Sequence, residues 1–123
     1  PLLGLVALER VLWPNKSGHR IDWVVVGGES GAGARPMQPE WARTLRDECA
    51  AARVPYYFKQ CGEWAPAGDT ANGERLVRIG KRKAGSLLDG VDHKAWPQQA
   101  HAATGLRWND VMSEAVSTKE ILP

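Results

Sequence analysis

Cysteine is scarce in this 123-residue chain, which has two cysteines, Cys49 and Cys61. Two are too few for the disulfide framework of a small secreted protein, and their separation does not make a Cys-x-x-Cys pair. The chain also lacks a recognisable signal peptide and any apolar stretch long enough to span a bilayer. We therefore expect a cytoplasmic protein in a reducing environment, with no membrane partner.

The histidines give no sign of a metal site or a thiol nucleophile. His19, His93 and His101 show no metal-ligand spacing with one another or with the cysteines, so we expect no metal. No histidine lies near Cys61 in sequence, which leaves a Cys–His nucleophile unsupported. Cys49 lies on an apolar helical stripe and is interpreted as an inert core residue.

Net charge is also small, at +2 from 16 basic and 14 acidic residues. A balance this near neutral does not by itself indicate a nucleic-acid partner. The concentrated basic run is Lys81-Arg82-Lys83, and such short runs are usually solvated. The length fits one domain, 1–123. Because the chain begins with Pro1 rather than Met, we expect it to be part of something larger.

Tyrosine and phenylalanine are rare, whereas tryptophan is frequent, with six residues. Trp is large and amphipathic, so several should sit at partly covered surfaces or contacts. The pattern places Trp23 and Trp41 on core faces. Trp64, Trp96 and Trp108 fall in loop-like stretches, where they either stack on a base or, as we favour, pack against the rest of a larger protein.

The periodicity predicts a strand–helix–strand unit in the first half of the chain. Residues 21–26 end in a continuous apolar run typical of a strand buried on both faces, as in a parallel sheet. A helix should start at Pro39 and stop by Arg53, because the residue before Pro55 disfavours helix. Residues 55–59 read as a second strand, so the two strands should be parallel.

The remaining segments carry weaker patterns. The predictions there are a helical face over 1–13, a loop over 65–74, an edge strand at 76–79, one helical turn or irregular structure over 84–88, and a weak helix over 108–118.

Two polar segments follow the predicted strands, and ligands gather beyond the carboxyl ends of parallel strands. The first is 27–31 and the second is 59–64, so we expect Glu29, Ser30, Lys59 and Gln60 to face one rim. The glycines there allow a close approach of backbone to a phosphate, carboxylate or cofactor, or they form a tight turn. Neither the Walker nor the dinucleotide glycine spacing is present.

Glu29 has three functional interpretations: a general base, an acceptor for a ligand amine, or a metal ligand. The structural alternative is an ion pair with Lys59 or Arg35. Lys59 either holds an anionic group or reaches into solvent from the strand end.

Several stretches together resemble a family of phage-encoded and prophage proteins of unknown function, which is similar to radical S-adenosylmethionine enzymes. These stretches are 21–31 with Arg35-Pro36-Met37, the helix 41–49, the strand 54–60, Gly62-Glu63-Trp64, and 85–90 with Trp96-Pro97. The resemblance spans roughly residues 1–97, and residues 98–123 match nothing we can place.

The resemblance implies an α/β fold in which this chain is the carboxyl-terminal part of an incomplete (β/α) barrel, with an irregular C-terminal segment. It implies that S-adenosylmethionine and an iron–sulfur cluster belong to the full-length protein. This chain lacks the cysteine cluster, so we expect no cofactor in the fragment and no activity of the fragment alone. Gly27-Gly28-Glu29 has the letters of the superfamily motif that contacts the methionine amine, although that motif lies in the early half of the barrel.

Three hypotheses follow. In the first, Gly27, Gly28, Glu29, Ser30, Arg35, Lys59 and Gln60 contribute to a cofactor or substrate pocket. In the second, the basic run and nearby tryptophans form a nucleic-acid-binding module. In the third, the chain is a ligand-free structural fragment whose apolar edges are covered by the rest of the barrel or by a second copy, giving a homo-oligomer.

Overall fold

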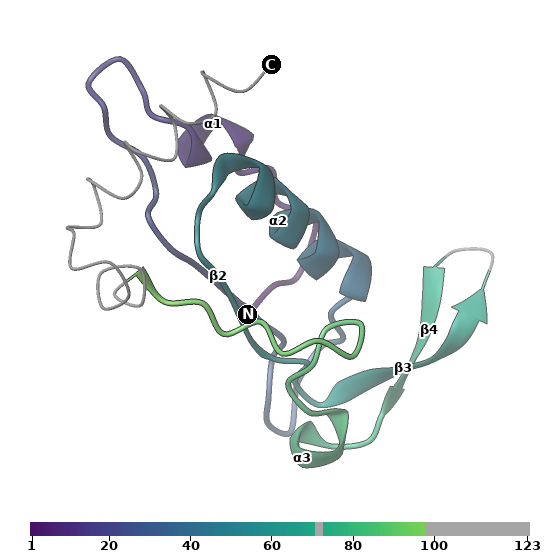
Figure 1. The fold of residues 1–123 in the computed structure, drawn as a ribbon. Coiled ribbons are helices and arrows are strands. Elements are labelled where there is room, and N and C mark those ends of the chain that lie inside the picture. The colour runs from purple at the N-terminus through teal and green to yellow at the C-terminus, as the bar shows by residue number, and fades with distance from the viewer. Residues whose placement is uncertain (71–72, 98–123) are drawn as a thin grey trace.

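The structure, a computed structural model, describes residues 1–70 and 73–97. The helix predicted over 108–118 and Trp108 lie outside the described residues. In chain order the elements are α1 (Glu9–Leu12), β1 (Val24–Gly27), α2 (Pro39–Ala52), β2 (Tyr56–Gln60), β3 (Trp64–Thr70), β4 (Gly73–Arg78) and α3 (Lys81–Ala84) (Figure 1).

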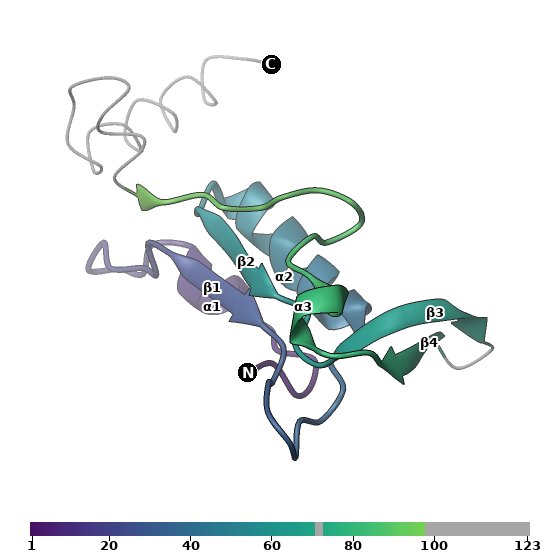
Figure 2. The ribbon, with the colours of Figure 1, turned by 90° about the horizontal axis from the view of Figure 1, so that it is seen from below.

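The predicted α/β unit is confirmed. β1 and β2 pair in parallel, with Val24 opposite Tyr56 and Val26 opposite Phe58, and α2 connects them across one face of the sheet (Figure 2). Helix α2 begins with Pro39, whose missing N–H is not needed in the first turn. It ends before Arg53, which adopts a left-handed conformation with φ 56° and donates its amide to the carbonyl of Ala50.

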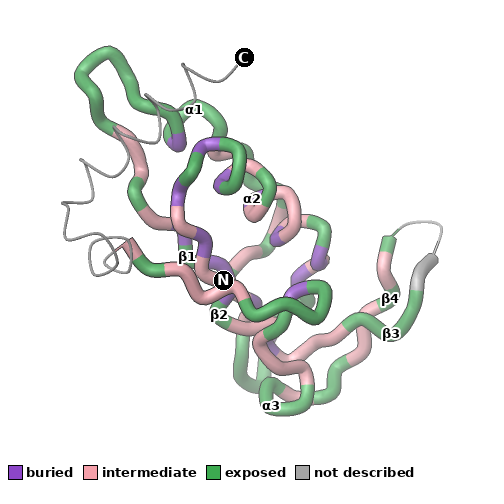
Figure 3. The backbone as a smooth tube through the Cα atoms, in the orientation of Figure 1, coloured by how far each residue is buried: buried purple, intermediate pink, exposed green. Residues whose placement is uncertain are grey.

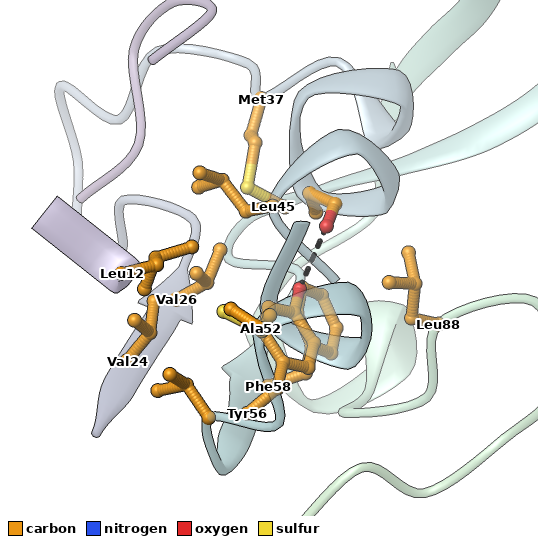
Figure 4. Packing of buried hydrophobic residues seen from close by; sticks show 12 residues of the cluster. Leu12, Val24, Val26, Met37, Leu45, Ala52, Tyr56, Phe58 and Leu88 are labelled. Atoms are coloured by element: carbon orange, nitrogen blue, oxygen red, sulfur yellow. Dashed lines mark hydrogen bonds between the residues drawn. The ribbon is translucent and has the colours of Figure 1, made fainter. Parts of the chain in front are cut away.

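The core lies between α2 and the covered face of the sheet, where Figure 3 shows the buried residues gathered. Phe58, Leu12 and Cys49 are fully buried there, which confirms the structural interpretation of Cys49. The hydroxyl of Tyr56 donates to the carbonyl of Ala42 over 2.9 Å, so β2 and α2 are joined by a hydrogen bond as well as by packing (Figure 4). This hydrogen bond keeps the buried phenol satisfied.

The prediction that the first strand is buried on both faces is wrong for the described chain. Val24 and Val26 point into the core, but Val25 on the opposite face is 49% exposed. The reason is that α2 covers one face and no helix among the described residues covers the other. The outer edge of β2 is covered, because Phe58 donates to the carbonyl of His93 and Ala95 donates to that of Tyr56.

Of the residues predicted as a loop over 65–74, those at 65–70 and 73–74 instead belong to β3 and β4, which pair as an antiparallel hairpin. Turn-forming residues in this stretch favour a loop, but the pairing tolerates them through an irregularity between Pro66 and Gly68. The edge strand predicted at 76–79 is confirmed over 76–78, the second half of β4, and Ile79 follows the strand. A salt bridge between Arg43 of α2 and Glu74 of β4 attaches the hairpin to the βαβ unit.

The helical face predicted over 1–13 is present only in the single turn of α1. Leu12 is buried as that face requires, but Leu5 is exposed, and Leu2 donates its amide to the carbonyl of Gly27 at the end of β1. Of the two alternatives predicted over 84–88, irregular structure is the one present after Gly85, apart from a bridge between Leu88 and Val91. The helical turn is α3, which ends at Ala84. No described helix is long and apolar enough to cross a membrane.

Candidate functional site

The segments that follow β1 and β2 pack directly against each other, backbone to backbone. Gly28 donates its amide to the carbonyl of Gln60 over 2.9 Å, and Glu63 donates to the carbonyl of Glu29 over 3.2 Å. A Cβ atom at Gly28 would lie 1.9 Å from the carbonyl oxygen of Cys61. Gly62 has φ +89°, and a Cβ there would lie 2.3 Å from the carbonyl oxygen of Glu29. These two glycines therefore serve the close approach of the two strand ends.

This approach produces a hollow of about 470 Å³ at the carboxyl ends of the parallel strands, which we call the strand-end hollow. It is lined by Pro1, Val25, Gly27, Gly28, Glu29, Ser30, Lys59 and Gln60. Six of the seven residues predicted as cofactor-binding are thus brought together at one mouth. Arg35 is not part of the lining but contacts it through Glu29.

Glu29 is held by Arg35. Its carboxylate accepts hydrogen bonds from the Arg35 amide over 3.0 Å, from Nε over 3.0 Å and from Nη2 over 3.2 Å. The side-chain hydrogen bonds from Arg35, followed by its backbone amide, lower the pKa of Glu29 to about 2. A carboxylate this acidic is a poor proton acceptor at neutral pH, so the geometry favours Glu29 as a fixed negative charge over a general base. The ion pair with Arg35 is present, and Lys59 is not its partner.

Two residues that the sequence did not single out position the loop after β1. Glu63 accepts a hydrogen bond from the amide of Gly31 over 3.1 Å, and Arg78 donates to the carbonyl of Gly31 over 2.8 Å. Glu63 directly follows Gly62 in the second polar segment, which was a usable signal. Arg78 comes from β4, and nothing in the sequence links it to this loop.

A second hollow of about 460 Å³ adjoins the first and shares Lys59 and Gln60 with it. We call it the basic hollow, and its lining consists of Lys59, Gln60, Lys81, Arg82, Gly85 and Ser86. Helix α3 lies beside the end of β2 (Figure 2), and the amide of Cys61 donates to the carbonyl of Gly85 over 2.9 Å. The basic run is therefore exposed on a helical turn beside the candidate site, where the sequence indicated a solvated loop.

The cysteines do not form a reactive or metal-binding centre in the described part of the chain. Burial raises the pKa of the Cys49 thiol to about 11 and also raises that of half-buried Cys61. Within residues 1–70 and 73–97, no group of three or more His, Cys, Asp or Glu side chains gathers where a metal could bind.

Three aromatic residues cluster on the open face of the parallel sheet. The ring centroids of Trp23 and Trp96 lie 4.8 Å apart, and both rings meet Tyr57 edge-on, at 6.0 and 5.3 Å. Trp23 is therefore only half-buried here, whereas it was predicted on a core face. Trp41 does pack against the core, and Trp64, placed by the sequence in a loop, opens β3 and donates to the carbonyl of Ala34.

Comparison with known proteins gives a family but no activity. Neither the curated proteins nor the solved structures include a significant match to this chain. One family model does match, and it covers residues 1–97, which include the described strands, helices and both hollows. The chain therefore belongs to DUF5131, a family of proteins of unknown function.

Proposed function

We propose that the strand-end hollow is a cofactor or substrate pocket for a zwitterionic, amino-acid-type ligand, S-adenosylmethionine foremost, in a phage-related, radical-SAM-like barrel. The observation that carries the proposal is the parallel pairing of β1 and β2, which puts Glu29 and Lys59 at one mouth. Open α/β folds bind ligands at this end of the strands.

The charges of the hollow suit such a ligand. Lys59 is exposed and provides an ammonium group for a ligand carboxylate. Glu29 provides a carboxylate for a ligand amine, and its low pKa keeps that charge present across the physiological pH range. Arg35 and Glu63 fix the loop that carries Glu29, so the negative charge is held in place before a ligand arrives.

The cysteines of this chain do not suit an iron–sulfur cluster. Clusters need several thiolates, and the chain has two cysteines, one fully buried in the core and the other half-buried. In our proposal the cluster belongs to another part of a full-length, cytoplasmic protein, so this chain alone performs no complete reaction. When bound, S-adenosylmethionine would supply the reactive sulfonium, and the residues here would orient its amino-acid end.

The open face of the sheet supports the idea that more protein covers this chain. Val25 and Trp96 are 49% and 42% exposed on it, beside Trp23 and Tyr57. Exposed apolar residues gathered on one face are typical of a surface that contacts other protein. We propose that the rest of a barrel, or a second copy of the chain in a homo-oligomer, provides it.

Calorimetric titration of S-adenosylmethionine tests the pocket. Lys59→Ala and Glu29→Gln should each weaken binding by about tenfold, because each removes one charge-assisted contact. Lys83→Ala and Glu40→Gln are matched controls, since both residues are exposed and neither lines the hollow. Unchanged affinity in both site variants would remove the proposed role. So would an equal loss in the controls, since that would indicate a general charge effect.

A further inference from the structure

We propose that the basic hollow is a separate binding site for the phosphate group of a small molecule. Three cationic residues from two parts of the chain line this one hollow: Lys59 at the end of β2, and Lys81 and Arg82 on α3. The sequence run Lys81-Arg82-Lys83 does not reveal this convergence, because Lys59 joins it only through the fold. The proposal is independent of the pocket proposed above, apart from the shared Lys59 and Gln60.

The cations that line the hollow are not paired with carboxylates in the described part of the chain. Within residues 1–70 and 73–97, none of Lys59, Lys81 and Arg82 forms a salt bridge, whereas Arg35, Arg43, Arg46 and Lys94 all do. Like charges around one concavity repel one another unless an anion lies between them. The hollow has a formal charge of +3 and no carboxylate in its lining, so a phosphate dianion leaves it at +1.

The donors available match a phosphate. Two ammonium groups, the guanidinium fork of Arg82 and the hydroxyl of Ser86 offer several donors to the oxygens of one tetrahedral anion. A lone carboxylate has fewer oxygens to satisfy them. The hollow therefore favours phosphate over an amino-acid carboxylate, which distinguishes it from the strand-end hollow.

The walls are fixed by hydrogen bonds before a ligand binds. Gly80, which precedes α3, donates to the carbonyl of Glu63 over 3.0 Å. The Gly85 carbonyl accepts from the amide of Cys61, and the Ser86 carbonyl accepts from the ammonium of Lys94 over 3.2 Å. The first two bonds tie both ends of the α3 segment to the segment that follows β2. Pre-formed walls of this kind reduce the ordering cost of binding.

The test is titration of inorganic phosphate and pyrophosphate into the full chain at constant ionic strength, followed by amide NMR shifts. Lys81→Gln, Arg82→Gln and Ser86→Ala alter the lining, and Lys83→Gln is the matched control on the same helix. We expect Lys81→Gln and Arg82→Gln to weaken binding about tenfold, since a charge-assisted contact is lost. Ser86→Ala should weaken it about threefold, and Lys83→Gln should change it less than about twofold.

Three outcomes would overturn the proposal. The first is no saturable phosphate binding at millimolar concentration. The second is an equal loss in the Lys83 control. The third is a single-stranded oligonucleotide that binds more tightly than pyrophosphate and loses affinity equally in Lys81→Gln, Arg82→Gln and Lys83→Gln. That result would make the run a nucleic-acid contact. Titrating S-adenosylmethionine into the Lys81→Gln variant separates the two sites, because this variant should bind S-adenosylmethionine as tightly as the wild type does. If the wild-type protein does not bind S-adenosylmethionine, only the strand-end proposal fails.

Discussion

Gly28 faces the carbonyl oxygen of Cys61 so closely that a Cβ at residue 28 would lie 1.9 Å from it. This contact ties the segment after β1 to the segment after β2, and Gly28 itself lines the strand-end hollow. Rotation of a side chain cannot relieve this clash, because the atom that the added Cβ would meet belongs to the backbone of Cys61. The geometry of the candidate site therefore depends on glycine at this position.

Gly28→Ala should destabilise the protein by about 3 kcal/mol or more, because the two strand ends must separate to admit a methyl group. Gly33→Ala is the control: it lies in the same loop, meets no atom within 4 Å and lacks a positive φ, so we expect less than about 1 kcal/mol. Urea unfolding at equilibrium measures both. Equal stability of the two variants would show that the strand ends do not touch as described.

The Glu29–Arg35 pair should contribute to stability in a defined pH range. The folded pKa of Glu29, about 2, lies below its ordinary value of 4.5. The contribution is therefore present above pH 4.5 and is lost as the pH falls toward 2. Arg35→Ala should raise the Glu29 pKa toward 4.5 and flatten this part of the stability profile. Carbon-detected NMR titration of the Glu29 carboxyl checks it, and an unchanged midpoint in the variant would exclude the Arg35 side chain as the cause.

Tyr56→Phe should cost about 1 kcal/mol, because it removes the buried hydrogen bond to the Ala42 carbonyl and leaves that oxygen with one acceptor contact fewer. Tyr57→Phe on the open face is the matched control and should be near neutral, since that ring is half-buried and its hydroxyl forms no hydrogen bond within residues 1–70 and 73–97. Thermal unfolding distinguishes them. A larger loss in the control would reverse the assignment of the two faces.

The two cysteines should differ in reactivity. Cys49 is fully buried and burial raises its pKa to about 11, so iodoacetamide should modify it only when the chain unfolds. Cys61 is half-buried with a raised pKa, so it should react sooner than Cys49 yet more slowly than in the unfolded chain. Mass spectrometry of peptides over time measures each rate, with urea-unfolded protein as the reference. Equal rates in the folded chain would contradict the packing of α2.

The sequence predicts the βαβ unit well because its signals are local. Pro39 and Pro55 bracket α2, and the run ending at Val26 indicates a strand irrespective of what surrounds it. The exposed Val25 could not be predicted, since the sequence pattern assumes covered faces and only the structure shows which face is covered. The hairpin was missed because Pro66 and Gly68 are typical of loops, and their pairing depends on the partner strand.

The candidate site follows the same division. The rim of Glu29 and Lys59 was predictable, because parallel strands must end on the same side. Arg35 was recognised as one of two partners for Glu29, and the geometry decides between them. The place of Lys81 beside Lys59 was not predictable, because it depends on how the hairpin turns the chain back toward the end of β2.

The most direct test of the account is an amide NMR titration of S-adenosylmethionine into the full chain. The account predicts that the amides of residues 28–31 and 59–61 shift together along one saturation curve, while those of α1 stay unchanged. Shifts confined to one of the two segments, or gathered on another face of the protein, would contradict a shared binding mouth at the ends of β1 and β2.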